Sequence, residues 1–358
     1  MRSISALGLQ GFLSEANKEG FMSIFKPFRI CLTLLILASM ADARVQPRTH
    51  RRKAPASSIS SDPARVNDPK LMDSMGPGAK GSAVVRAQIL LDRTGFSPGE
   101  IDGNFGKNLQ NTVTAYQKSH GLQENGSIGV ETWQALNADS MPAVQQYTIA
   151  HEDVAGPFEK IPTDMMAQAK LSALGYESPL DGLAEKFHSS PKLLTEWNRG
   201  KSFDKEGETI TVPNVPAQPL PMAASIVVDG SDLSVSALDE SGKVLAHFPA
   251  SVGSAHDPLP VGNWKILGVK RNPIFHYNPK LFWDAEGKQS KVNIAPGPRN
   301  PVGVVWISLS KEHYGIHGTP WPSHIGYTQS HGCIRLTNWD ASKLADMVKP
   351  GIPAILKE

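Results

Sequence analysis

The spacing of hydrophobic residues divides the chain into a helical part and a part built of short strands. Between residues 81 and 137, apolar residues recur at intervals of three and four, which predicts short helices. After Ala224 apolar and polar residues alternate, which predicts strands joined by tight turns. The expected strands are 225–228, 233–238, 244–248, 263–269, 304–309 and 353–356, with one helix at 339–348. We therefore expect a mainly β domain, a sandwich or barrel, over residues 224–358.

Two smaller folded parts are expected before this β domain. Residues 79–140 have room for three short helices around a small core, with a turn at 101–106. Residues 146–215 combine a helix-loop-helix pattern with a short strand at 209–213, which indicates a small α+β module. The proline-rich run that follows predicts a stiff linker. The fold class is thus multidomain, with a mainly β domain at the end.

The first 78 residues carry signals of export and of a linker. Lys26 and Arg29 precede a short apolar run, and an Ala-x-Ala sequence ends at Ala43, which is typical of a secretory signal. The apolar run is short for a membrane span, although an uncleaved anchor is the alternative. Met22 is a candidate start. Residues 44–78 are basic and then rich in Pro, Ser and Asp, which predicts a disordered linker.

Length, charge and cysteine content narrow the range of functions that the chain could have. The 358 residues suffice for two or three domains, and the formal net charge of +2 does not suggest nucleic acid as a partner. Cleavage after Ala43 would remove Cys31 and leave Cys333 as the single thiol. An unpaired thiol in an exported protein is a candidate for reactivity.

Two histidines could act as the base of Cys333, one beside it in the sequence and one distant in sequence. It stands in the run Ser-His-Gly-Cys-Ile-Arg at 330–335, and His317 stands in Tyr-Gly-Ile-His-Gly-Thr at 314–319. A cysteine nucleophile needs a thiolate, and an imidazole can take its proton and stabilise the anion. His331 is two residues away, but the turn at Gly332 leaves its direction open. We favour His317, which ends a strand-like segment and can approach across the sheet.

The remaining site residues follow from these roles. The ring of His317 needs a partner at its other nitrogen, and the carbonyl of Gly318 is the nearest candidate. His331 and the backbone N–H groups of Gly332 and Cys333 are candidates for stabilising an oxyanion. Arg335 is placed to meet a substrate carboxylate or to brace the loop. Further candidates for substrate binding are Ser330, Tyr314 and Trp321.

Two other interpretations of Cys333 remain open at this point. A lone cysteine is often an inert buried residue. Cys333, His331 and His317 could instead bind zinc, although His313 or His324 would have to supply a fourth ligand. We expect no metal or organic cofactor.

The two N-terminal modules resemble known wall-binding domains. The helical segment resembles the helical peptidoglycan-binding domain at 88–91, 95, 101–106, 115–117, 121–122 and 132–136. The middle segment resembles a LysM carbohydrate-binding module at 183–187, 193–194, 198 and 207–214, with about 20 extra residues before Leu183. These resemblances imply binding to the glycan or the stem peptides of peptidoglycan.

The C-terminal domain resembles the YkuD-type L,D-transpeptidase catalytic domain over about residues 225–357. The resemblance lies at 259–264, 296–303, 306–307, 314–319, 325–326, 330–336 and 338–341, although Leu259 stands where threonine is usual. It implies that Cys333 attacks a stem tetrapeptide at the L-centre carbonyl of the diamino acid and releases D-alanine. An amine then resolves the thioester. On this pattern His317 is the base, and His331 and Gly332 stabilise the oxyanion.

The expected protein is an exported L,D-transpeptidase of the periplasm or cell wall. Its acceptor is a second stem peptide, giving a 3-3 cross-link, or an envelope protein tethered to the wall. Two alternatives are an L,D-carboxypeptidase or hydrolase of the same bonds, and a non-catalytic wall-binding protein.

Overall fold

The computed structural model describes residues 61–285, 289–328, 330 and 332–358. The predicted signal at 1–43 and residues 44–60 of the predicted linker lie outside the described residues. No helix in the described part is long and apolar enough to cross a bilayer.

Residues 61–78 are folded, so the linker prediction is wrong for this stretch. They contain α1 (Pro63–Val66), in which Val66 is fully buried, and Leu71 is only 7% exposed. Met75 exchanges two backbone hydrogen bonds with Ile128, at 3.0 and 2.8 Å. The few apolar residues of this stretch are too widely spaced to give a periodic signal, yet Val66, Met72 and Met75 pack on the domain that follows.

The helical domain contains the three predicted helices, α2 (Ser82–Arg93), α3 (Lys107–Ser119) and α4 (Val130–Leu136). Leu90, Tyr116 and Trp133 lie in one buried cluster between them. The turn before α3 is held by the side chain of Gln88, whose amide accepts from the backbone N–H of Gly103 at 2.8 Å.

The middle module is a two-stranded antiparallel sheet whose two strands are connected by a segment that contains helices. Strand β1 (Val144–Thr148) pairs with β2 (Thr209–Pro213), and α7 (Pro179–Lys186) and α8 (Pro191–Trp197) lie between them in the chain. The extra residues before α7 carry two one-turn helices, α5 (His151–Val154) and α6 (Met165–Gln168).

The C-terminal domain is built on a sheet of nine described strands that curls back on itself. The order across the sheet is β5-β4-β3-β13-β7-β10-β11-β12-β6. Strands β5 and β6 lie at opposite ends of this order, yet only Ala250 separates them in the chain. The two edges are therefore neighbours, and the sheet is barrel-like. The strands are β3 (Ser225–Asp229), β4 (Ser234–Leu238), β5 (Val244–Pro249), β6 (Ser251–Val252), β7 (Gly262–Arg271), β10 (Val305–Leu309), β11 (Gly315–His317), β12 (Ile334–Arg335) and β13 (Pro353–Lys357).

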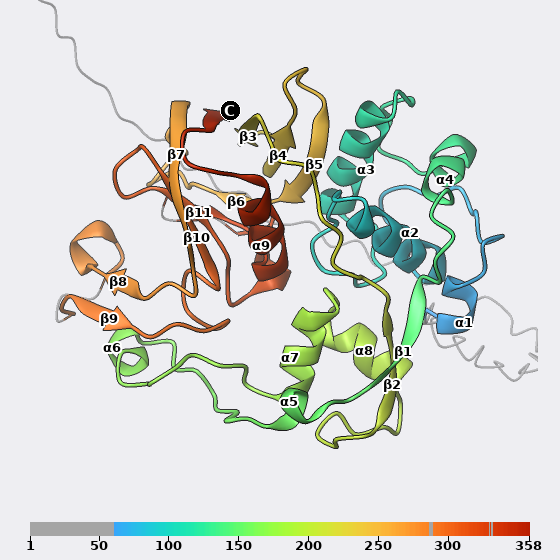
Figure 1. Cartoon of the computed structure of the whole chain (residues 1–358), viewed down its shortest axis with the longest axis horizontal. Helices are drawn as coiled ribbons and strands as arrows, with labels where there is room; N and C mark the ends of the chain where they lie inside the picture. Colours follow the sequence, from blue (N-terminus) through green and yellow to red (C-terminus); the bar gives the residue numbers. More distant parts are fainter. Residues whose placement is uncertain (1–60, 286–288, 329, 331) are drawn as a thin grey trace, which may run out of the picture. The chain divides into compact units, whose positions relative to one another are not determined.

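A helix and a hairpin complete this domain. Helix α9 (Asn338–Met347) packs on the sheet through Leu344 and Met347, which are fully buried, and Figure 1 shows it beside β10 and β11. Strands β8 (Phe275–Tyr277) and β9 (Val292–Ile294) form a separate hairpin. The mainly β prediction is confirmed, and its six strands and helix agree with the structure to within about two residues.

A buried polar junction joins the three parts into a single compact unit. Asp92 of α2 binds Lys343 of α9 at 2.9 Å and lies 3.0 Å from Nδ1 of His188, which comes from the middle module. Asp340 of α9 accepts a hydrogen bond from the hydroxyl of Ser97 at 2.9 Å.

The junction predicts a pH-dependent change in stability. Burial raises the pKa of Asp340 to about 7, so its ionisation opposes folding as the pH rises from about 4 to beyond 7. We predict that Asp340→Asn raises the free energy of unfolding by roughly 1–3 kcal/mol at pH 8 and by less than about 1 kcal/mol at pH 4. Urea denaturation followed by tryptophan fluorescence measures both values. An equal loss of stability at the two pH values would contradict the prediction.

Candidate active site

Parallel pairing of β11 and β12 brings the predicted base and nucleophile to one side of the sheet. Ile316 lies opposite Ile334, and His317 lies opposite Arg335. The two isoleucines are fully buried in the core, so His317 and Arg335 point to the other side. Cys333, two residues before Arg335, shares that side. Residues 16 positions apart in sequence therefore become diagonal neighbours across two strands.

His317, Arg335 and Cys333 all line a groove of about 1550 Å³. One of its walls comes from β8 and from residues between 281 and 289 that follow it, and another part comes from the start of α6 and the residues just before it, in the middle module. The lining includes, besides these three residues, Thr163, Asp164, Met165, Lys270, Phe275, Tyr277, Phe282, Asp284, Trp306, Lys311, Tyr314, Thr319 and Trp321.

The ring of His317 is held in one tautomer. Its Nδ1 lies 2.6 Å from the carbonyl oxygen of Gly318, the contact that we predicted from the sequence. Because a carbonyl only accepts, Nδ1 carries the proton and Nε2 keeps a lone pair in the neutral ring. Trp306, opposite His317 on β10, stacks on the imidazole with ring centroids 5.3 Å apart.

Burial disfavours the charged forms of both His317 and Cys333. Burial, together with the charge of Arg335, lowers the pKa of His317 to about 3. Burial raises the pKa of the Cys333 thiol above its ordinary value, although a backbone hydrogen bond from Gly315 and the charge of Arg335 oppose the shift. The site at neutral pH therefore holds a thiol and an imidazole. A permanently ionised sulfur does not fit these shifts.

The loop around the cysteine depends on a glycine. Gly332 has φ +94°, and a Cβ there would lie 2.8 Å from the ring of Tyr314. The backbone at this position is thus restricted to glycine, and Tyr314 packs directly against it.

Two predicted substrate contacts have different surroundings. Ser330 is only 4% exposed; its hydroxyl donates to the carbonyl of Cys333 at 2.5 Å and its N–H donates to Gly253 at 2.9 Å. Ser330 therefore braces the loop, and it is not among the described residues that line the groove. Trp321 is half exposed at the groove and stacks near His324. His331, the predicted oxyanion partner, lies outside the described residues.

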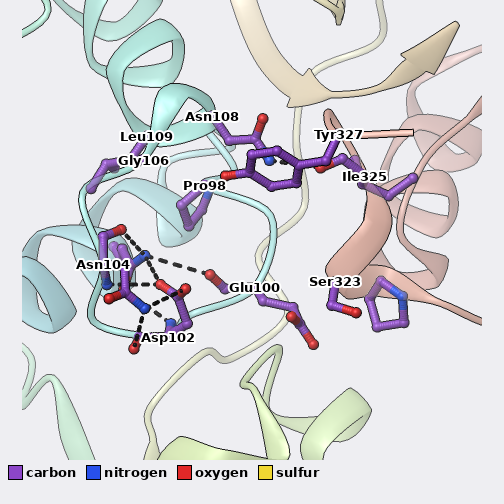
Figure 2. A pocket seen from close by; sticks show the side chains of 12 residues that line it. Pro98, Glu100, Asp102, Asn104, Gly106, Asn108, Leu109, Ser323, Ile325 and Tyr327 are labelled. Carbon is purple, nitrogen blue, oxygen red and sulfur yellow. Dashed lines mark hydrogen bonds between the residues drawn. The ribbon is translucent and has the colours of Figure 1, made fainter. Parts of the chain in front are cut away.

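A second pocket, of about 80 Å³, lies where the helical domain meets residues 322–327 (Figure 2). Glu100 lies in it, and burial together with the charge of Asp102 raises the pKa of that carboxyl to about 7. Among the described residues that line it there is neither histidine nor cysteine, whereas Cys333 and His317 line the larger groove. Within the described ranges no group of three or more His, Cys, Asp or Glu side chains is arranged to hold a metal.

Comparison with known proteins identifies the family to which this chain belongs. A profile of the L,D-transpeptidase catalytic domain matches residues 223–356, and one of a putative peptidoglycan-binding domain matches residues 80–136. The chain is 30% identical over 175 residues to the putative L,D-transpeptidase YkuD of Bacillus licheniformis, covering 48% of this chain and 89% of that protein. The chain belongs to the L,D-transpeptidase family.

Two further proteins are similar to this chain. The probable L,D-transpeptidase ErfK/SrfK of Salmonella typhimurium is 29% identical over 180 residues, covering 48% of this chain and 57% of that protein. Among solved structures, an L,D-transpeptidase from Xylanimonas cellulosilytica has a TM-score of 0.34 at 16% identity, covering 80% of this chain and 98% of that one.

Two residues of this L,D-transpeptidase site had no role assigned from the sequence. Trp306 supports the His317 ring, and Asn338 lies against the loop that follows His317. Both lie within segments that carry the family resemblance, but their contacts with the site depend on strand register and on the start of α9. Neither can be read from spacing in the sequence.

The neutral resting pair predicts how the thiol responds to pH. Below its pKa the thiolate fraction grows tenfold per pH unit, and only the thiolate is alkylated. We predict that alkylation of Cys333 by iodoacetamide accelerates roughly tenfold per unit between about pH 6 and pH 8.5. Mass spectrometry of the labelled peptide measures the rate, and Cys333→Ala gives the background from Cys31. A plateau between pH 5 and 7 would indicate a preformed thiolate–imidazolium pair.

Proposed function

We propose that Cys333 and His317 carry out the L,D-transpeptidase reaction on peptidoglycan stem peptides. The observation that supports these roles is the shared face of β11 and β12, which presents a thiol, a neutral imidazole and a guanidinium to one groove. The family assigns the reaction class. The chain's own geometry supports the choice of Cys333 and His317.

The first step forms a thioester. The Cys333 sulfur attacks the L-centre carbonyl of the diamino acid while its proton passes to Nε2 of His317. The Nδ1–H···O=C bond to Gly318 holds the ring in the tautomer that can accept this proton. The backbone N–H groups of Gly332 and Cys333, with His331, stabilise the oxyanion. The imidazolium then protonates the departing amine, and D-alanine leaves.

The second step reverses the proton movement. An acceptor amine attacks the thioester carbonyl and gives its proton to Nε2 of His317. The carbon–sulfur bond breaks, and the leaving sulfur recovers a proton from the imidazolium. A second stem peptide as acceptor yields a 3-3 cross-link, and an envelope protein as acceptor yields a tether to the wall.

Arg335 has two roles in this scheme. It lines the groove on the same face as Cys333, so its guanidinium is placed to bind a carboxylate of the stem peptide. Its charge also helps to keep His317 neutral. Substrate binding that neutralises Arg335 would raise the basicity of His317 at the moment when a base is needed.

The N-terminal modules hold the enzyme on its polymeric substrate. The helical domain matches a peptidoglycan-binding family, and we assign the middle module, residues 146–215, as a LysM-like glycan binder because α7 and α8 lie in the chain between two paired strands. Peptidoglycan as substrate implies an envelope location. Export by a signal at 1–43 into the periplasm completes the proposal.

The reaction requires both residues. We predict that Cys333→Ala forms no cross-linked dimer from disaccharide-tetrapeptide, and that His317→Ala lowers kcat by about 10²–10⁴-fold. Liquid chromatography with mass spectrometry measures dimer, D-alanine and tripeptide, with and without added acceptor amine. Dimer formation by Cys333→Ala would contradict the assignment. Release of D-alanine to give only tripeptide, even with excess acceptor, would make the protein an L,D-carboxypeptidase.

A β-lactam tests the nucleophile separately. One solved L,D-transpeptidase, from Mycobacterium tuberculosis, is described with a faropenem-derived adduct. We predict that incubation with a carbapenem adds one covalent adduct to the intact protein, mapped to Cys333, and none to Cys333→Ala. An unmodified wild-type protein would favour a non-catalytic wall-binding role.

A further inference from the structure

A buried ionic cluster joins the middle module to the segment that follows the catalytic base. Arg299, only 8% exposed, donates from Nε to Oδ2 of Asp181 at 2.9 Å, and its Nη2 binds the other oxygen of that carboxylate. Its Nη1 donates to the carbonyl of Pro320 at 2.5 Å. Asp181 belongs to α7, whereas Pro320 lies three residues after His317. One guanidinium therefore connects the two.

Glu185, one turn further along α7, belongs to the same cluster. Its carboxylate lies 3.6 Å from Nη1 of Arg299 and accepts a hydrogen bond from the hydroxyl of Tyr176 at 3.0 Å. The same carboxylate accepts from the side-chain amide of Asn338, with its two oxygens 3.1 and 3.2 Å from Nδ2. The middle module thus supplies the acceptor for an amide at the start of α9.

Asn338 lies directly against the loop that holds the base. Its Oδ1 accepts from the N–H of Val304 at 3.2 Å. A Cβ on Gly303 or Gly318 would fall 2.0 or 2.1 Å from this oxygen, so the amide is packed on both glycine backbones. The carbonyl of Gly318 is the partner of Nδ1 of His317. Three contacts therefore lead from Glu185 to the imidazole.

The orientation of the Asn338 amide depends on Glu185. The oxygen and nitrogen of an amide are nearly the same size, so hydrogen bonding decides which faces which way. With Nδ2 donating to Glu185 and to Pro298 at 3.1 Å, Oδ1 must face Val304 and the two glycines. The reversed amide would set Nδ2 against the N–H of Val304, which is a contact between two donors.

We propose that Glu185 is a positioning residue for His317, so that the middle module completes the catalytic centre in addition to any role in binding the wall. This inference rests on the proposed role of His317 as the base. Glu185 touches neither substrate nor the reacting atoms in this scheme. It acts through Asn338 and the backbone of Gly318.

The test is a donor–acceptor swap in the full-length protein. In Glu185→Gln, only one side-chain oxygen remains to accept from Nδ2 of Asn338, which contacts both oxygens of Glu185 in the wild type. In Asn338→Asp, two carboxylates face each other. Each single variant is expected to lower kcat about tenfold with KM within about twofold, because the base and not the substrate groove is displaced. The double variant restores a hydrogen bond with its direction reversed, because the amide at position 185 on α7 now donates to the carboxylate at position 338 on α9. We expect its kcat to recover at least about threefold of the loss. The rescue is partial because a carboxylate at position 338 cannot donate to the carbonyl of Pro298, as the Asn338 amide does.

The matched control is Glu196→Gln, the same change on α8 of the same module, which is expected to keep the wild-type kcat. Near-ultraviolet circular dichroism provides the folded fraction by which each rate is divided. Wild-type kcat in Glu185→Gln, an equal loss in Glu196→Gln, or additive losses in the double variant would overturn the inference. Failure of the proposed function is distinguishable, because the wild-type protein itself would then form no dimer.

Discussion

The hydrogen bond between Nδ1 of His317 and the carbonyl of Gly318 is the interaction on which the catalytic account depends. A neutral imidazole can accept a proton at only one nitrogen, and this bond leaves Nε2 as the acceptor. The bond joins neighbours in sequence, but it exists only because β11 ends at His317 and the chain turns at Gly318. The parallel partner β12 then places Cys333 and Arg335 on the same face.

Burial sets the resting protonation of the site. Burial of the imidazole and partial burial of the thiol disfavour the charged form of each, and the nearby guanidinium further disfavours imidazolium. These pKa directions favour a neutral thiol beside a neutral imidazole at neutral pH. In the proposed mechanism, charge separates when the sulfur attacks the substrate carbonyl.

Much of the architecture could be predicted because its signals are periodic and long. Helix α2 and strands β3, β4 and β7 carry enough residues for the hydrophobic pattern to be read. Strands β11 and β12 have three and two residues, which is too short for any pattern, and they are the strands that build the site. The folded stretch at 61–78 was missed because its apolar residues are few, and Asn338 because its role arises from contacts distant in sequence.

The middle module and the catalytic domain are in direct contact next to the candidate active site. Asp181 and Glu185 approach Arg299 and Asn338 from α7, while Thr163 and Asp164 line the groove, so the middle module is both scaffold and wall of the site. If the middle module binds glycan as proposed, it does so in direct contact with the catalytic domain.

Nitrogen NMR of the histidine-labelled protein tests the central claim most directly. Long-range ¹H–¹⁵N correlations, assigned by comparison with His317→Gln, report the protonation of both ring nitrogens. The account predicts that His317 is neutral and protonated at Nδ1 throughout about pH 5–8, because its pKa is lowered to about 3. An imidazolium in that range, or a ring protonated at Nε2, would contradict it.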